Sequence, residues 1–242
     1  FDPATLFSGD NGGVYDPSDL STLFQNSDGT GAVTSDGDPV GYIADLSGNG
    51  NHLIQATAAD RPLYKTSGGV HWLEQQDAAD HLSTTGTTVS ASANAYTGAG
   101  LQIETGGGIN TPLFAAALPF GVSTSSGTFG IFQRSDVVQR VVAAIRVGAG
   151  AAFSSTINSA YTVGGASFRA EAYHESDTLT ATTTGATDVS TAATVTGTPV
   201  SAPISIFATT GCVAKFYGGV VINRALTADE KTDVRDWIDA RI

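Results

Sequence analysis

The sequence contains no methionine, a single cysteine and few charged residues. Only 14% of its 242 residues are charged, and acidic side chains outnumber basic ones 23 to 11, which gives a formal charge of −12. Because an acidic chain repels phosphate backbones and anionic lipid, we expect no nucleic-acid partner. No apolar run approaches the length of about eighteen residues that a membrane helix needs, so we expect no membrane insertion.

The single cysteine, Cys212, cannot form an internal disulfide. Its neighbours in TTGCVAKFYGG are typical of a strand that would bury the thiol as a small apolar group. The chain begins at Phe1 without the basic and apolar segments of a signal peptide. We therefore expect export, if it occurs, by assembly into a particle, by another route or after removal of a leader.

Short apolar segments alternate with turn residues along most of the chain. Asp28-Gly29 and Asn49-Gly50 are turn dipeptides, and strand-like segments such as VHWLEQ, GLQIET and ASFRAEAYHE continue from residue 70 to about residue 222. The segment VVQRVVAAIRV has the composition of a helix, but its β-branched residues favour a strand. The pattern predicts an all-β fold, a two-sheet antiparallel jelly-roll sandwich, as a single domain over residues 1–242.

Two helices are expected, one near each end of the chain. Asp16 is placed to cap a helix that starts at the following proline, which predicts one or two turns through Phe24. In LTADEKTDVRDWIDARI, Thr227 and Glu230 have the spacing of a capping box. Apolar residues at helical spacing follow, so this C-terminal helix should lie against the sandwich with Trp237 facing inward.

The segment SFRAEAYHE alternates as expected for a strand with one buried face. The alternation predicts one face toward the core and the other toward solvent, the first with Phe168, Ala170, Ala172 and His174 and the second with Arg169, Glu171, Tyr173 and Glu175.

Motifs for catalysis are sparse. A retaining glycosidase needs two carboxylates about 5 Å apart, and the strand-like segments offer only Glu171 and Glu175, with Tyr173 between them. His174-Glu175 lacks the second histidine of a zinc-protease motif, and neither a G-x-S-x-G motif nor a phosphate-binding glycine loop is present. We therefore expect no catalytic residues and a protein that is not an enzyme, with a glycan-cleaving hydrolase or lyase as the alternative.

The segment from Asp45 to Asn51 resembles a calcium-binding loop in part. Oxygen-bearing side chains stand at alternate positions before Gly50, but Ala56 occupies the position where a bidentate acid would be required. The main interpretation is a structural turn in which Asp45 and Asn49 bond their own backbone. A weak calcium site at these two residues is the alternative, and no other cofactor is expected.

Aromatic rings can stack on sugar faces, and three tyrosines lie in polar, glycine-rich or alternating contexts. Together with Glu175 they form the candidate glycan-binding set, which comprises Tyr96, Tyr161, Tyr173 and Glu175. Ordinary packing within strands or at their rim is the alternative for each tyrosine. Both tryptophans, Trp72 and Trp237, are expected in the core.

Three segments stand out as motifs. The first runs from VYDPSDLSTLF through DPVGYIADLSGNGNHLIQATAADRPLY, the second is VHWLEQQDAADHLST, and the third is KFYGGVVINRALTADEKTDVRDWI. They resemble the concanavalin A-like, laminin-G-type jelly-roll domains found in bacteriophage structural proteins and bacterial surface proteins. Where that family has Phe-Asp-Gly, this chain has residues 74–76 as Glu-Gln-Gln, which leaves Asp77 and Asp80 as candidate equivalents of the acidic positions.

The segment DPSDLSTLF and the exit through Arg61, Pro62 and Tyr64 are most similar to versions carried by phages and gene transfer particles, as tail, fibre or head-spike parts. The resemblance implies a receptor-binding module for cell-surface polysaccharide, on a virion, a phage-like particle or otherwise outside the cell. Its further partners would be particle subunits, in a homo-oligomer or a larger assembly. A purely structural capsid-decorating protein is the second alternative.

Overall fold

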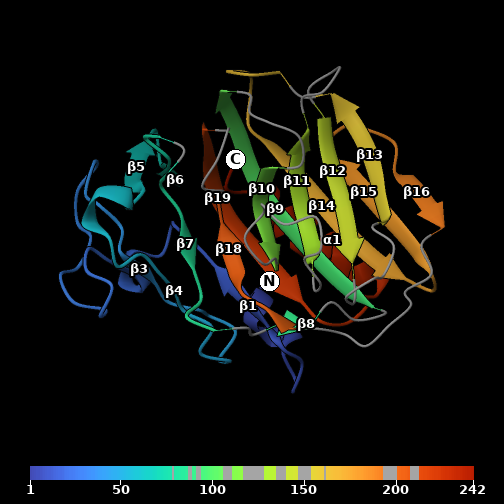
Figure 1. Cartoon of the computed structure of the whole chain (residues 1–242), viewed down its shortest axis with the longest axis horizontal. Coiled ribbons are helices and arrows are strands. Elements are labelled where there is room, and N and C mark those ends of the chain that lie inside the picture. The colour runs from blue at the N-terminus through green and yellow to red at the C-terminus, as the bar shows by residue number, and fades with distance from the viewer. Residues whose placement is uncertain are drawn as a thin grey trace.

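The computed structural model describes residues 1–77, 79–86, 89–90, 94–105, 111–116, 128–134, 140–146, 154–160, 162–192, 201–207 and 213–242. Strands dominate and form two large antiparallel sheets, with one α-helix near the C-terminus (Figure 1). The predicted fold class, a two-sheet jelly-roll sandwich with a C-terminal helix, is confirmed. The extent of the domain over residues 1–242 stays a prediction, and Cys212 lies outside the described residues.

The first sheet carries the helix on its outer face. Its strands, in spatial order, are β16 (Val189–Ala192), β15 (Thr178–Thr183), β14 (Phe168–Glu175), β9 (Ala95–Thr105), β19 (Val213–Ile222), β6 (Val70–Glu74) and β5 (Leu63–Ser67). One more strand, β1 (Gly12–Tyr15), also pairs with β19. Segments near the two ends of the chain therefore meet in this sheet.

The second sheet contains β12, which belongs to the segment with a helix-like composition that was predicted to be a strand. Its order is β13 (Ser154–Ala160), β12 (Arg140–Arg146), β11 (Thr128–Arg134), β10 (Thr111–Ala116), β18 (Ile204–Ile206), β7 (Leu82–Ser83), β4 (Leu53–Ile54), β3 (Tyr42–Ile43) and β2 (Leu23–Phe24). Residues 140–146 of VVQRVVAAIRV form β12, so the strand prediction is confirmed for them, and the rest of that segment lies outside the described residues. A separate pair joins β8 (Val89–Ser90) and β17 (Ser201–Ala202).

The main core lies between the inner faces of the two sheets. Phe114 from the second sheet contacts Tyr15 edge-on and Phe216 of the first sheet, with ring centroids 6.1 and 5.3 Å apart. Ala170, Ala172 and His174 of β14 are buried, with Ala170 and Ala172 in this core, as their alternation predicted. Such interdigitated apolar side chains hold the sheets together.

A second apolar cluster joins the helix α1 (Ala228–Asp239) to the outer face of the first sheet. Trp237 and Val234 of the helix pack there with Val220 of β19. The predicted capping box is confirmed, because Thr227 Oγ1 accepts from Glu230 N at 3.2 Å and the Glu230 carboxylate accepts from Thr227 N at 2.8 Å. Trp237 faces inward, also as predicted.

The N-terminal helix differs from the expectation. Instead of one or two turns capped by Asp16, the chain forms a short 3₁₀ turn capped by Asp19. Asp16 bonds the backbone N and hydroxyl of Ser18, and it also pairs with Arg241, so its carboxylate holds a tight turn and cannot start a helix. The 3₁₀ turns are η1 (Pro3–Leu6), η2 (Leu20–Thr22) and η3 (Ala58–Asp60).

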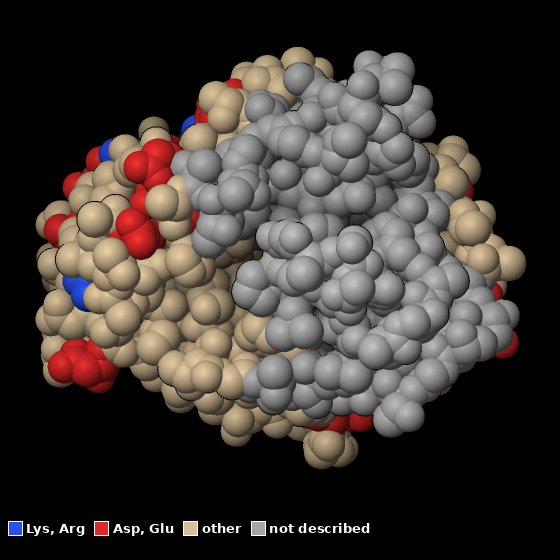
Figure 2. Space-filling view, viewed as in Figure 1, with Lys and Arg blue, Asp and Glu red and all other residues tan. Residues whose placement is uncertain are grey.

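Acidic side chains are prominent on one described part of the surface. On the side of the molecule drawn in Figure 2, acidic side chains gather at the end that carries β3 and β5, with few basic ones among them.

In the part of the chain that the structure describes, no helix has the length and apolar character needed to cross a membrane.

Candidate functional site

The structure brings two of the three candidate tyrosines, Tyr96 and Tyr173, together but buries the first of them. Tyr96 is fully buried on β9 beneath α1, so the prediction that it is exposed to a sugar is wrong. Its ring instead stacks on Tyr173, with centroids 6.3 Å apart. Burial, together with the negative charge of Glu171, raises the pKa of Tyr96 well above its ordinary value. Tyr161 lies outside the described residues.

Tyr173 and Glu175 lie beside the helix and contact the same lysine. Lys231 Nζ stands 4.1 Å from the ring centroid of Tyr173 and forms an ion pair with Glu175. The Tyr173 hydroxyl donates to Asp188 at 3.2 Å, and burial followed by the Asp188 charge raises its pKa to about 12. One face of this ring already carries a cation, and glycan binding by Tyr173 and Glu175 stays a prediction.

The face of β14 that was expected in solvent is covered in part by α1. Glu171 is completely buried there, and it accepts hydrogen bonds from Arg169 Nε and Arg235 Nε, both at 2.8 Å. Burial opposes the charge of Arg235, but Glu171 outweighs it and raises the Arg235 pKa. Glu171 therefore fastens the helix to the sheet, and the expectation of a wet face is corrected by this packing.

Asp45 bonds the backbone of its own turn, as the main interpretation expected, whereas the Asn49 side chain bonds the backbone of another segment. The Asp45 carboxylate accepts from Val14 N, Ser47 N, Ser47 Oγ and Asn51 N at 2.7–3.0 Å. The side-chain amide of Asn49 donates to two backbone carbonyls at the start of β1. These bonds tie the turn to β1, and within the described residues no cluster of three His, Cys, Asp or Glu side chains could hold a metal ion.

Asp80, a candidate equivalent of the family's acidic positions, also shapes a turn. It is buried and accepts from Gln76 N at 2.6 Å, and burial raises its pKa. The neighbouring Gln75 is buried as well, and it bonds the Asp80 carbonyl and the Ala214 amide. The turn after β6 is thereby fixed to β19.

Trp72 was expected in the core, but it lies partly exposed on the outer face of the first sheet. Strand alternation explains the difference: Leu73 takes the buried position on β6, which turns Trp72 outward. The indole ring lies beside Tyr217 of β19, with centroids 5.9 Å apart, and Lys215 Nζ is 5.4 Å from its centroid.

Polar and charged side chains surround this indole. Lys215 Nζ lies 2.7 Å from Glu104 and 3.8 Å from Glu74, while Trp72 Nε1 donates to Glu74 at 3.0 Å. The Tyr217 hydroxyl donates to an amide oxygen 2.8 Å away on β9, and burial with the two nearby carboxylates raises its pKa to about 12. We call this surface the aromatic strip; it comprises Trp72, Glu74, Gln102, Glu104, Lys215 and Tyr217.

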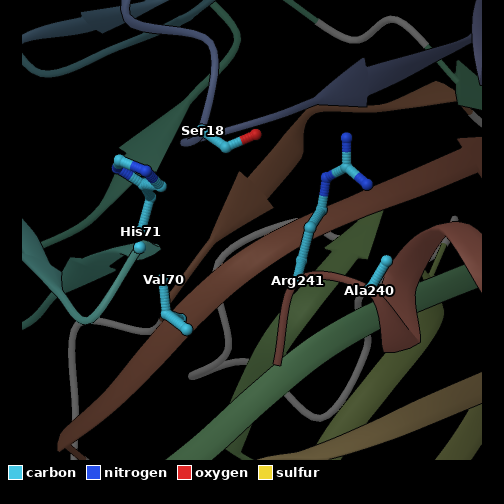
Figure 3. Close-up of a pocket in the computed structure, with 6 residues that line it drawn as sticks. Ser18, Val70, His71, Ala240 and Arg241 are labelled. Atoms are coloured by element: carbon cyan, nitrogen blue, oxygen red, sulfur yellow. The ribbon is translucent and has the colours of Figure 1, made fainter.

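A pocket opens at the end of the strip, where two strands share one edge of β19. β1 pairs with residues 219–222 and β6 pairs with residues 215–216, so Tyr217 and Gly218 lie between them. A side chain at Gly218 would meet both Trp237 and Arg241 at 3.3 Å. The pocket has a volume of about 290 Å³. We call it the junction pocket; it is lined by Ser18, Gly69, Val70, His71, Ala240 and Arg241 (Figure 3).

Arg241 is the most constrained polar group of the junction pocket. Its guanidinium stacks on Trp237 at 3.8 Å, and it donates to Asp16 at 2.6 Å and to the Trp237 carbonyl at 2.7 Å. Across the pocket, His71 Nδ1 lies 2.6 Å from the Tyr64 hydroxyl. Figure 3 shows His71 and Arg241 on opposite sides, with Ser18 between them in the upper part of the view.

The junction pocket and the aromatic strip are linked through strand β6. Val70 and Trp72 are alternate residues of β6, so they stand on the same face about 7 Å apart. An aromatic ring flanked by fixed donors and acceptors is the arrangement that can bind a flat, hydroxyl-rich molecule. In the sequence, only the alternation with Leu73 indicated that Trp72 faces outward. No local pattern indicated that residues 71 and 241 line the same pocket.

No protein-family model and no curated protein matches the sequence. Solved structures do match the fold. A GH54 α-L-arabinofuranosidase mutant soaked with 4-nitrophenyl α-L-arabinofuranoside has a TM-score of 0.66 at 14% identity, over 100% of this chain and 65% of that one. The botulinum neurotoxin type G receptor-binding domain has a TM-score of 0.55 at 12% identity, over 86% and 52%. Trypanosoma rangeli sialidase with the inhibitor DANA scores 0.53 at 11% identity, over 82% and 30%.

The prediction that the chain is not an enzyme is contradicted by these structures, because arabinofuranosidases and a sialidase share its fold. The chain spans about half the length of two further arabinofuranosidase structures, 51% of each. At such low identity the likeness shows the fold alone: a β-sandwich shared by glycoside hydrolases and a toxin's receptor-binding domain.

Proposed function

We propose that this chain recognises carbohydrate through the aromatic strip. The observation that carries the proposal is the partly exposed Trp72 ring, held between Tyr217 and a set of fixed polar groups. In this proposal the chain stands on the surface of a virion, a phage-like particle or a cell, in a homo-oligomer or a larger assembly. Polysaccharide is its partner, and repeated copies raise a weak affinity per site.

The chemistry of the strip suits a sugar better than a purely apolar ligand. A sugar ring presents C–H groups on its face, which pack on an indole, and hydroxyls at its edge, which need both donors and acceptors. Lys215 supplies donors, and the carboxylates of Glu74 and Glu104 supply acceptors. All three groups are already positioned by one another, so little side-chain freedom is lost on binding.

Hydrolysis of the bound glycan is the second candidate function, and the pair of Glu74 and Glu104 favours it. Both carboxylates contact Lys215 Nζ, at 3.8 and 2.7 Å, so these oxygens lie no more than about 6.5 Å apart, a limit that includes the separation of about 5–5.5 Å in retaining glycosidases. Lys215 occupies the space between the two carboxylates. It would have to move before a glycosidic oxygen could enter.

The test is binding of the full chain to an array of purified polysaccharides, with Trp72→Ala as the decisive variant. Loss of the indole platform should weaken binding about tenfold or more. Trp72→Phe is the matched control, because it keeps an aromatic face, and it should retain most of the binding. Unfolding midpoints of all variants show whether each one is folded.

Tyr173→Ala distinguishes the strip from the site predicted by the sequence. Binding that survives Trp72→Ala and disappears in Tyr173→Ala would place the site beside the helix, and a wild-type chain that binds no polysaccharide would contradict carbohydrate recognition. New reducing ends in the same mixtures, lost in Glu74→Gln or Glu104→Gln, would add hydrolysis to binding.

A further inference from the structure

We infer that the junction pocket takes one neutral sugar residue of the bound glycan, and that it does not take a uronic acid or another acidic sugar. The inference rests on the proposed function, because it concerns the glycan that lies on the aromatic strip. It extends that function by naming the chemical class of the residue at the end of the strip.

The size and place of the pocket set the first limit. Its volume of about 290 Å³ lies just below the range of about 300–1,000 Å³ for small-molecule sites, which suits a single sugar ring. Val70 lines the pocket and Trp72 carries the strip, on the same face of one strand. A chain that stacks on Trp72 can therefore place its next residue in the pocket.

The hydrogen-bonding groups of the pocket require a ligand that both donates and accepts. Arg241 has five N–H groups, and among the described residues two of them are used, one by Asp16 and one by the Trp237 carbonyl. Ser18 Oγ donates its proton to Asp16 at 2.6 Å, which leaves its lone pairs as acceptors. A sugar hydroxyl can accept from Arg241 and donate to Ser18, whereas a carboxylate can only accept.

The charge balance of the pocket disfavours an acid. The positive charge of Arg241 is already paired with Asp16, whose carboxylate would stand close to any carboxylate that approached the guanidinium. The chain as a whole carries a formal charge of −12, which adds long-range repulsion of anionic ligands. Ligand selection here is therefore expected to exclude negative charge.

The test uses methyl glycosides of neutral sugars, namely glucose, galactose, mannose and arabinofuranose, beside methyl glucuronide and methyl galacturonide, each titrated into the full chain. Ala240→Trp fills the pocket from an exposed position without removing a polar group. Thr232→Trp, at an exposed position within α1 that does not line the pocket, is the matched control. At least one neutral glycoside should bind about tenfold more tightly than either uronide, and Ala240→Trp should weaken it about tenfold while Thr232→Trp leaves it unchanged.

Equal or tighter binding of a uronide would overturn the inference. So would the absence of binding by every neutral glycoside, or an Ala240→Trp chain that binds like the wild type. Polysaccharide binding that is lost in Trp72→Ala but kept in Ala240→Trp would leave the proposed function standing and remove only the pocket. A wild-type chain that binds no polysaccharide would instead contradict the proposed function.

Discussion

The outer face of the first sheet has two halves that differ in what covers them. Beneath α1, β9 and β19 present glycine or apolar side chains, such as Gly98 and Val220. Further along the same strands stand Gln102, Lys215 and Tyr217, beyond the apolar cluster under the helix. A Cβ at Gly98 would lie 3.2 Å from Ile238 of the helix, so the absence of a side chain permits the close approach. The contrast shows that the same two strands carry apolar residues where the helix covers them and polar residues where it does not.

The largest expected effect comes from comparing one carboxylate from each half. Glu171→Ala removes a fully buried carboxylate and leaves Arg235 without its ion-pair partner, so the free energy of unfolding should fall by about 3–5 kcal/mol. Glu104→Ala removes a partly exposed carboxylate that pairs with Lys215, and the loss should be under about 1 kcal/mol. Urea unfolding of both variants measures the difference. Equal losses would show that the two halves are not distinct.

Local signals in the sequence were sufficient for most of the fold. The capping box at Thr227, the turn dipeptides and the alternation in β14 all act between residues a few positions apart. They predicted the strands and the terminal helix. Local patterns did not show where that helix packs. For this reason the outer face of β14 was wrongly expected to be exposed to solvent.

The candidate site depends on contacts between distant residues. Arg241 lies over Gly218 and faces His71, and these three come together only because β1 and β6 share an edge of β19. Register between strands far apart in sequence is set by the whole core, so no short motif could predict the pocket. The outward position of Trp72 could have been predicted from the sequence, because Trp72 alternates with the buried Leu73.

A smaller effect on stability is expected from the ion pair at the start of the helix, in the covered half. Glu230 accepts from both Nη atoms of Arg224 at 2.7 and 2.9 Å, and these bonds lower its pKa from 4.5 to about 2. Its folded-state pKa lies below the unfolded one, so its stabilisation is complete above about pH 4.5 and is lost as the pH falls toward 2. Glu230→Gln should destabilise the chain by about 1–2 kcal/mol at pH 7.

The difference between the wild type and Glu230→Gln should shrink as the pH falls through that window. Thermal unfolding at a series of pH values measures it. Asp233→Asn, on an exposed position of the same helix, is the matched control and should change stability by less than about 0.5 kcal/mol at pH 7. A difference for Glu230→Gln that stayed constant down to pH 2 would exclude the carboxylate as its cause.

The smallest effect is expected in the open half, from Tyr217→Phe. The change removes one hydroxyl that donates to Gln102 at 2.8 Å and keeps the ring beside Trp72. Because Gln102 is only partly buried, the free energy of unfolding should fall by about 1 kcal/mol or less. Polysaccharide binding should persist, since the aromatic surface is intact. Urea unfolding and the same polysaccharide array check both statements, and loss of binding as severe as in Trp72→Ala would assign recognition to the hydroxyl instead of the ring.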